Sequence, residues 1–177
     1  MRPNKEDYIA YYDYYINLIP QGDIVSALES NHQEILNFIR SIPTDKAEYK
    51  YADNKWTVKQ VLNHIIDTER IFSYRALRFS RGDSQTLLPY DENIYAANAS
   101  LSKTDLNLLA EEFDVVRRAT ILQYKQLTEK ELLAKGSTSA GENNVLAIGF
   151  CICGHAKHHI NIIRERYLNN YILSTNN

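Results

Sequence analysis

The sequence has few of the residues and segments that mark secreted or membrane proteins. Only two of its 177 residues are cysteines, and Cys151 and Cys153 lie too close along one expected helix for an unstrained disulfide. They are interpreted as reduced thiols, in agreement with a cytoplasmic location. No stretch reaches the roughly 20 apolar residues of a membrane span, and the N-terminus lacks the apolar run of a signal peptide. We therefore expect a cytoplasmic protein with no membrane partner.

The sequence also lacks a strong excess of charge of either sign. The formal net charge is −2, so the electrostatics give no reason to expect nucleic acid as a partner. Hydrophobic residues make up 44% of the chain and charged residues 24%, which are ordinary proportions for a protein with a packed core. A chain of this length is expected to form one domain, spanning residues 1–177.

Helical periodicity dominates the sequence, and no pair of alternating strands is recognisable. Thr57 and Gln60 have the spacing of a capping box, as do Ser102 and Asp105. Long amphipathic helices are predicted at about 23–40, at 57–80, from 102 to beyond 121, and from Asn143 or Asn144 to about 168.

The segments between these helices are long. A short helical turn is predicted near 91–99, and the Gly- and Ser-containing segment 135–144 is predicted to be a loop. Four long helices in one chain predict an all-α fold, a four-helix bundle. The connections before the second and third helices exceed what tight hairpins need, which favours long crossover connections and leaves the helix order open.

Three histidines stand in the last predicted helix, in a stretch that otherwise resembles a buried helix face. The stretch is GHAKHHINII, residues 154–163. Positions four residues apart share a face, so His155 and His159 point the same way. His158 lies at the edge of this face, and we predict that it is not a ligand. Neutral imidazole binds zinc, nickel, copper and iron, so the pair is a candidate for part of a metal site.

A third ligand has to come from another helix, and two histidines remain as candidates. His64 borders the apolar arc of its helix, whereas His32 stands between two polar residues and is interpreted as solvent-facing. We therefore select His64. The alternative is a structural role, in which buried histidines only satisfy one another by hydrogen bonds.

Two further residues on inward faces allow two interpretations each. Glu69 projects into the apolar arc of its helix, where a carboxylate must be paired, protonated or hydrogen-bonded. A buried Glu–Arg pair that fixes helix register is preferred, with Arg75 and Arg166 as basic residues nearby, over a group that orients metal ligands or a substrate. Cys151 lies one turn before His155 and is interpreted as a small apolar filler in preference to a fourth ligand.

Tyrosine is in excess, with 13 residues, and it gathers near the N-terminus. Tyr8, Tyr11, Tyr12 and Tyr15 recur at spacings of three and four, so as a short helix they would form one aromatic side. Segment 1–20 is expected to pack on the bundle or to cap it. Two interpretations stay open: the rings complete the core, or they close the metal pocket or a homodimer contact.

The combination of motifs resembles the DinB-like superfamily of four-helix bundles. The resemblance is carried by KWTVKQVLNHIIDTERIFSYRALRFSRGD (55–83), LLPYDEN (87–93) and GHAKHHINIIRERYL (154–168). It implies a crossover bundle with a divalent metal held by three histidines, which here are His64, His155 and His159. Zinc or nickel is the expected ion, because both suit nitrogen ligation with water. A homodimer is also implied.

The resemblance implies a metal-dependent enzyme of the thiol S-transferase type, which uses a low-molecular-weight thiol such as bacillithiol or mycothiol and a small-molecule electrophile. A metal lowers the pKa of a coordinated thiol and presents a thiolate. Three histidines also leave open coordination positions, so a metal-dependent hydrolase is an alternative. A non-catalytic metal-binding or small-molecule-binding protein of a stress response is another. The sequence identifies no catalytic or cofactor-binding residue beyond the metal ligands.

Overall fold

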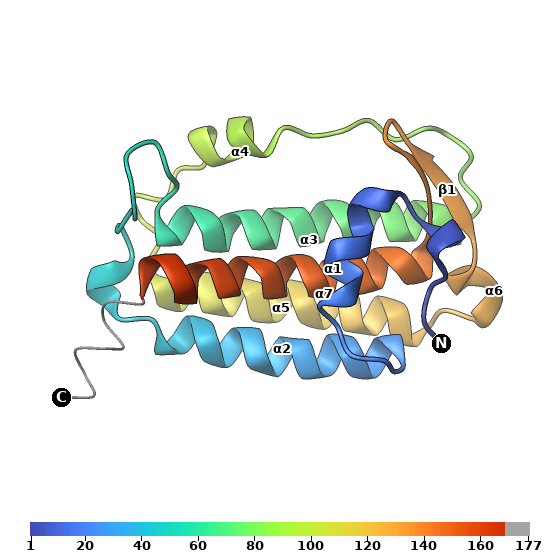
Figure 1. The fold of residues 1–177 in the computed structure, drawn as a ribbon, viewed down its shortest axis with the longest axis horizontal. Helices are drawn as coiled ribbons and strands as arrows, with labels where there is room; N and C mark the ends of the chain where they lie inside the picture. The colour runs from blue at the N-terminus through green and yellow to red at the C-terminus, as the bar shows by residue number, and fades with distance from the viewer. Residues whose placement is uncertain (169–177) are drawn as a thin grey trace.

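The computed structural model describes residues 1–168 and consists mainly of helices (Figure 1). The four long helices are α2 (Ile24–Ser41), α3 (Val58–Ser80), α5 (Leu106–Lys125) and α7 (Val145–Ile162), which continues as a π-helical turn over Ile163–Tyr167. The shorter ones are α1 (Asp13–Asn17), α4 (Glu92–Asn98), α6 (Glu129–Leu132) and the 3-10 turns Lys5–Asp7, Ala10–Tyr12 and Thr44–Lys46. The predicted all-α bundle is confirmed, and residues 169–177 of the predicted domain lie outside the described part.

The long helices begin at the capping residues that the sequence offers. Thr57 accepts a hydrogen bond from the backbone of Gln60, whose side chain accepts one from the backbone of Thr57, as predicted. Asn144 caps α7 by accepting from Ala147. The prediction of a capping box that begins at Ser102 was wrong, because Asp105 itself is the N-cap of α5.

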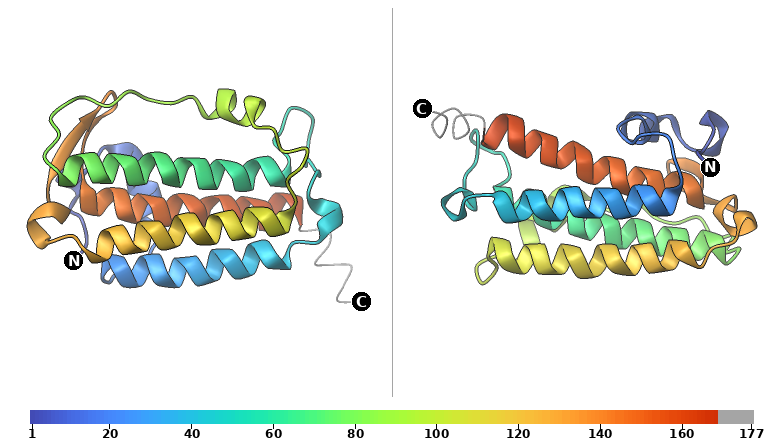
Figure 2. Two further views of the ribbon diagram at one scale, coloured as in Figure 1. Left: turned by 180° about the vertical axis from the view of Figure 1, so that it is seen from behind. Right: turned by 90° about the horizontal axis from the view of Figure 1, so that it is seen from below.

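The four helices pack in an order that differs from their order in the chain. α2 packs against α5 and α7, and α3 also packs against α5 and α7, so α2 and α3 occupy opposite corners of the bundle. Figure 2 shows the segment after α3 running back along the outside of the bundle, through α4, before α5 starts. This return is one of the predicted crossover connections.

The segment predicted as a loop after α6 forms a two-stranded hairpin. Strands β1 (Lys135–Thr138) and β2 (Gly141–Asn144) pair antiparallel, and Leu87 joins β1 through the backbone of Ser137. The prediction of no strands was wrong because these strands carry almost no apolar side chains, so their alternation is invisible to a hydrophobicity pattern. Gly141, with φ of 128°, supplies the turn.

A polar layer divides the bundle core into two apolar clusters. One cluster contains the start of α2 and the ends of α3 and α5, and the other contains the opposite halves of these helices. Between them each long helix contributes a buried polar residue: Asn31 from α2, Glu69 from α3, Arg117 from α5 and His155 from α7. Buried polar groups need hydrogen-bond partners, so this layer contains the candidates for a functional site.

None of the helices within residues 1–168 combines the length and the apolar character that crossing a membrane requires.

Candidate metal centre

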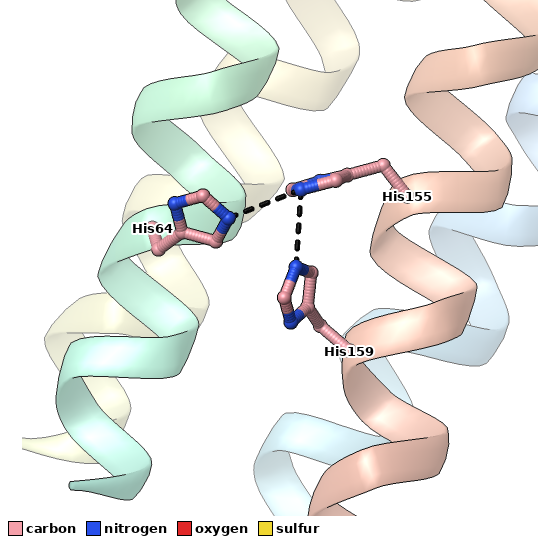
Figure 3. A group of neighbouring side chains, drawn as sticks. All are labelled: His64, His155 and His159. Atoms are coloured by element: carbon pink, nitrogen blue, oxygen red, sulfur yellow. Dashed lines mark hydrogen bonds between the residues drawn. The ribbon is translucent and has the colours of Figure 1, made fainter. Parts of the chain in front are cut away.

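Three histidines from α3 and α7 point toward one another in the middle of the bundle (Figure 3). His155 Nε2 lies 3.1 Å from His64 Nε2 and 3.1 Å from His159 Nε2. One nitrogen from each ring can be chosen so that all three lie within 4.8 Å of one another. The structure therefore brings together the three histidines that were selected from the sequence.

Helix geometry and aromatic packing hold the three rings in place. His155 and His159 are one turn apart on α7, and His64 stands on the neighbouring α3, two turns after its N-cap. The ring of Trp56 lies 4.9 Å from the ring of His64, and Phe72 lies 6.5 Å from His155. These contacts restrict rotation of the imidazoles and keep their nitrogens aimed at one point.

Burial keeps the three imidazoles neutral. It lowers the pKa of His64 to about 4, since the charged form loses its hydration. Burial, followed by the neighbouring histidines, lowers the pKa of His155 well below its usual value, and His159 is affected in the same way. A neutral imidazole has a free lone pair on one nitrogen, which is the form that binds a metal.

The contacts among the nitrogens fit a divalent metal better than they fit a closed hydrogen-bond network. Nε2 of His155 faces two other nitrogens, yet in a neutral ring it has either one proton or one lone pair to offer. Nitrogens about 2.1 Å from a tetrahedral zinc ion are about 3.4 Å apart, close to the 3.1 Å contacts seen here. His64, His155 and His159 thus form a donor set that suits such an ion.

His158 lies outside this group, as predicted. Its Nδ1 is 3.1 Å from the hydroxyl of Tyr14, and its ring packs edge-on against Tyr14 and Tyr15. His158 therefore faces the N-terminal segment and not the point where the other three converge.

The N-terminal tyrosines combine both interpretations drawn from the sequence. Tyr8 precedes the turn Ala10–Tyr12, which contains Tyr11 and Tyr12, and Tyr15 is on α1, which packs against α7. Tyr12 is 4% exposed and belongs to the core, whereas the ring of Tyr15 lies 5.6 Å from that of His155. Gly154 makes this approach close, because a Cβ there would lie 2.0 Å from the Tyr15 carbonyl oxygen. The segment both finishes the core and covers the histidines.

A pocket of about 310 Å³ opens beside the histidines. All three line it, together with aromatic side chains of α3 and of the N-terminal segment. The principal lining residues are Tyr11, Tyr12, Tyr15, Trp56, His64, Thr68, Phe72, Arg75, Tyr90, Glu92, Cys151, His155 and His159. A small molecule in this pocket would reach the histidine nitrogens from one side.

Polar groups behind His64 support its orientation. Thr68 stands one turn after His64, and its hydroxyl lies 3.5 Å from His64 Nδ1. The same hydroxyl is 2.6 Å from that of Tyr90. Partners of this kind fix the ring and tautomer of a metal-binding histidine.

Cys151 is buried beside the pocket, and burial raises the pKa of its thiol well above the usual value. It packs as the apolar filler that the sequence analysis preferred. Cys153 points elsewhere, close enough to Arg117 and Glu69 for their charges to affect its own raised pKa, which is set mainly by burial.

Glu69 belongs to a closed ion pair and not to the pocket. Arg117 Nε and Nη2 donate to its two carboxylate oxygens at 2.7 and 2.9 Å, and Nη1 donates to Asn31 Oδ1 at 2.6 Å. The buried Glu–Arg pair favoured from the sequence exists, but its arginine is on α5 and is neither Arg75 nor Arg166.

The interpretation of His32 as solvent-facing was wrong. It is 7% exposed, and its Nε2 lies 2.7 Å from Asp114 Oδ1 on α5. The residues next to His32 are polar, and its partner is 82 residues away in the chain, so nothing in the neighbouring sequence indicated this burial. His32 takes no part in the histidine group.

Sequence reasoning missed three contributors to this region. Arg117 follows Phe113 by one turn and so stands on the core stripe of its helix, a position where a charged residue signals a buried partner. Thr68 follows His64 by one turn, which was a readable sign of a supporting hydroxyl. Tyr90, from a connection, had no local signal.

Comparisons with known proteins agree with this arrangement. A family model described as the DinB superfamily matches residues 27–163. A search of curated proteins finds no match. Among solved structures, YfiT from Bacillus subtilis matches with a TM-score of 0.70 and 18% identity, over 93% of this chain and 90% of that one. YfiT is described as "a probable metal-dependent hydrolase with an unusual four-helix bundle topology", and at this identity the likeness shows the shared fold. Because the family model covers more than half of the sequence, the chain belongs to the DinB superfamily.

Proposed function

We propose that the protein is a metal-dependent enzyme that uses His64, His155 and His159 to hold a divalent ion, zinc or nickel. The observation that carries the proposal is the convergence of three neutral imidazole nitrogens at the wall of an open pocket. Hydrolysis is the reaction that this site supports best, and the description of the structurally similar YfiT as "a probable metal-dependent hydrolase" supports the same reaction class.

The pocket supplies several of the features that a hydrolytic site needs around an ion. A divalent ion bound by three histidines polarises a carbonyl group and lowers the pKa of a coordinated water toward about 7. The rings of Tyr12, Tyr15 and Phe72 restrict bulk water and offer an apolar surface to a substrate. Thr68 orients His64 from behind.

Thiol S-transfer is the second candidate, and one feature of the pocket favours it. Among its lining residues the only carboxylate is Glu92, which is exposed on α4. A buried base that could take a proton from water is thus absent from this lining. A low-molecular-weight thiol ionises far more readily than water, so it needs less help from the chain.

An assay of the zinc-loaded and nickel-loaded protein separates these reactions. Carboxylic esters and amides are incubated without thiol, and a bimane electrophile is incubated with and without added cysteine or bacillithiol. Ester or amide cleavage without thiol supports the hydrolase, and product formed only with thiol supports the transferase. Stoichiometric metal with no turnover of either kind would replace both with a binding function. Protein that takes up no metal would overturn the proposal.

The expected homodimer stays a prediction, which size-exclusion chromatography with light scattering would test.

A further inference from the structure

Arg75 is a buried cation in the pocket that forms no ion pair with any carboxylate of residues 1–168. It stands on α3, and only 8% of its surface is exposed. Its Nη2 donates to the carbonyl oxygen of Leu88 at 3.3 Å, and its guanidinium carbon lies 5.3 Å from the centre of the Phe72 ring. The side chain of Tyr12 is a further hydrogen-bond partner, but none of these partners carries a negative charge.

The other deeply buried arginine shows what a structural role looks like in this bundle. Arg117 is fully buried, and three of its nitrogens donate to Glu69 and Asn31. Burying a charge without such partners costs several kcal/mol. Arg75 has no anionic partner of this kind, and none of its nitrogens is both fully buried and unpartnered, so its remaining donors are open to the pocket that it lines, where a ligand can supply the acceptor.

Arg75 and the three histidines line the same pocket, and the ring of Phe72 links their positions. Phe72 lies one turn before Arg75 on α3, in the direction of His64, and the arginine folds back over this ring. Because the guanidinium carbon is 5.3 Å from the Phe72 centroid and that centroid is 6.5 Å from the centre of the His155 ring, the guanidinium carbon and the His155 ring are less than about 12 Å apart. One small molecule can reach both.

The charges in the pocket select the sign of such a molecule. Around Arg75 the pocket is lined by aromatic rings, and the hydroxyl of Tyr12 is the hydrogen-bond partner that this wall offers to the guanidinium. Glu92 is the only acidic residue of the lining and is exposed to solvent. The inner end of the pocket is therefore cationic, and a bound divalent ion would add to this charge.

We propose that Arg75 binds the carboxylate of the substrate, whose reacting group then lies at His64, His155 and His159. The planar guanidinium matches a carboxylate in a two-point hydrogen bond, which fixes direction as well as charge. The second half of this statement rests on the proposed metal-dependent function, whereas the carboxylate site at Arg75 stands on its own contacts. The substrate class is a small carboxylic acid with an apolar middle part, which suits the aromatic walls.

The test uses pairs of probes that differ only at one end. Alkyl hydroxamates, which bind metals, carry at their far end either a carboxylate or its methyl ester, in a series of increasing chain length. Binding to the zinc-loaded protein is measured by calorimetry and by the fluorescence of Trp56, the only tryptophan and a residue of the pocket. The carboxylate should bind about 10- to 100-fold more tightly than the ester, as expected for hydrogen bonds to a charged group. Equal binding of acid and ester to the wild-type protein would overturn the proposal without any variant.

Variants then assign the preference to a residue. Arg75→Gln should bind acid and ester equally, and Arg75→Lys should keep part of the preference, since a lysine retains the charge but not the planar fork. Glu92→Gln is the matched control from the same pocket. It should keep the preference for the acid or increase it, because a negative charge is removed. An unchanged preference in a folded Arg75→Gln protein would contradict the assignment.

The two proposals fail in different ways. If hydroxamates bind no more tightly than the matched amides, the metal-dependent function fails, while a preference for acid over ester still supports Arg75. In His159→Ala the hydroxamate should lose its advantage over the amide, and the preference for the acid should persist. Loss of the acid preference in His159→Ala would contradict an independent carboxylate site.

Discussion

Two polar clusters lie in the same middle layer of the bundle, and they differ in how completely their members satisfy one another. Glu69, Arg117 and Asn31 form a cluster with opposite charges and short, directed hydrogen bonds. His64, His155 and His159 are neutral, and their ring nitrogens converge on one point at the edge of a pocket, where they cannot all form hydrogen bonds with one another. The opposite charges of the first cluster satisfy each other without a ligand, although Nδ2 of Asn31 is buried with no hydrogen-bond partner, whereas the second cluster contains no such complementary pair. Buried polarity alone thus does not identify a site in this fold, whereas unsatisfied buried polarity beside a cavity does.

The largest effect should come from breaking the cluster of Glu69, Arg117 and Asn31. Glu69→Ala leaves the guanidinium of Arg117 buried and unpaired, which should lower the free energy of unfolding by about 3–5 kcal/mol. Urea denaturation of the metal-free protein measures this. The double variant Glu69→Leu with Arg117→Met is the control and should recover the loss, because apolar residues can replace a whole buried pair. A loss under about 1 kcal/mol in the single variant would show that the pair is not a structural element.

Removing one of the three histidines should instead change metal binding. His159→Ala removes one of the three nitrogen donors and should weaken zinc or nickel binding by more than about 100-fold. This loss exceeds the roughly 10- to 100-fold loss that is typical when only a residue supporting a metal ligand is removed. Nickel titration followed by quenching of Trp56 and elemental analysis measure this. His158→Ala is the matched control one residue away and should bind metal as the wild type does. Equal losses in both variants would mean that the wrong helix face was assigned.

A smaller effect is expected where the N-terminal segment meets the histidines. In Gly154→Ala the new methyl group would collide with the Tyr15 carbonyl, so α1 has to shift, at a cost of about 1–3 kcal/mol. Metal should then exchange faster with a chelator, since Tyr15 covers His155. Gly149→Ala is the control, because its methyl group would press on Tyr124 and Ile24 in the core. Gly149→Ala should lose stability without faster metal exchange. Identical metal exchange in the two variants would show that Tyr15 does not cover the histidines.

The smallest effect should come from the hydroxyl behind His64. Thr68→Val keeps the shape of the side chain and removes the contact with His64 Nδ1, so metal affinity should fall by about tenfold. Competition with a chelator measures the change. Thr120→Val makes the same replacement at a buried threonine whose hydroxyl bonds the backbone of α5, and it should leave affinity unchanged. An affinity loss in Thr120→Val of the same size would point to a general packing effect.

The features that sequence alone predicted well are those encoded within one helix. The capping box at Thr57 and Gln60 marked the start of α3, and the spacing of His155 and His159 placed both on one face of α7. The choice of His64 also agrees with the structure, because its neighbours in the helix show which side is apolar. Each of these needs only helical geometry and the local pattern.

The features that escaped prediction depend on contacts between distant segments. The partner of Glu69 is 48 residues away, and that of His32 is 82 residues away, so neither could be read from neighbouring positions. The hairpin Lys135–Asn144 is held by backbone bonds and by its link to Leu87, while its side chains are mostly polar. Arg75 was named only as a basic residue near Glu69, and its position in the pocket without an ion pair became visible only in the structure.

The crossover order has a consequence for how the protein is made. His64 and His155 are separated by 91 residues, and α7 is the last long helix to leave the ribosome. At synthesis rates of about 5–20 residues per second, the first histidine waits about 5–20 seconds for its neighbours. Since α2 and α3 occupy opposite corners, they cannot form a stable antiparallel hairpin during that time, and contacts so distant in the chain also slow folding. α5 packs against both α2 and α3 and is made before α7, so these three helices can associate first, and the histidine group can form only once α7 has been made.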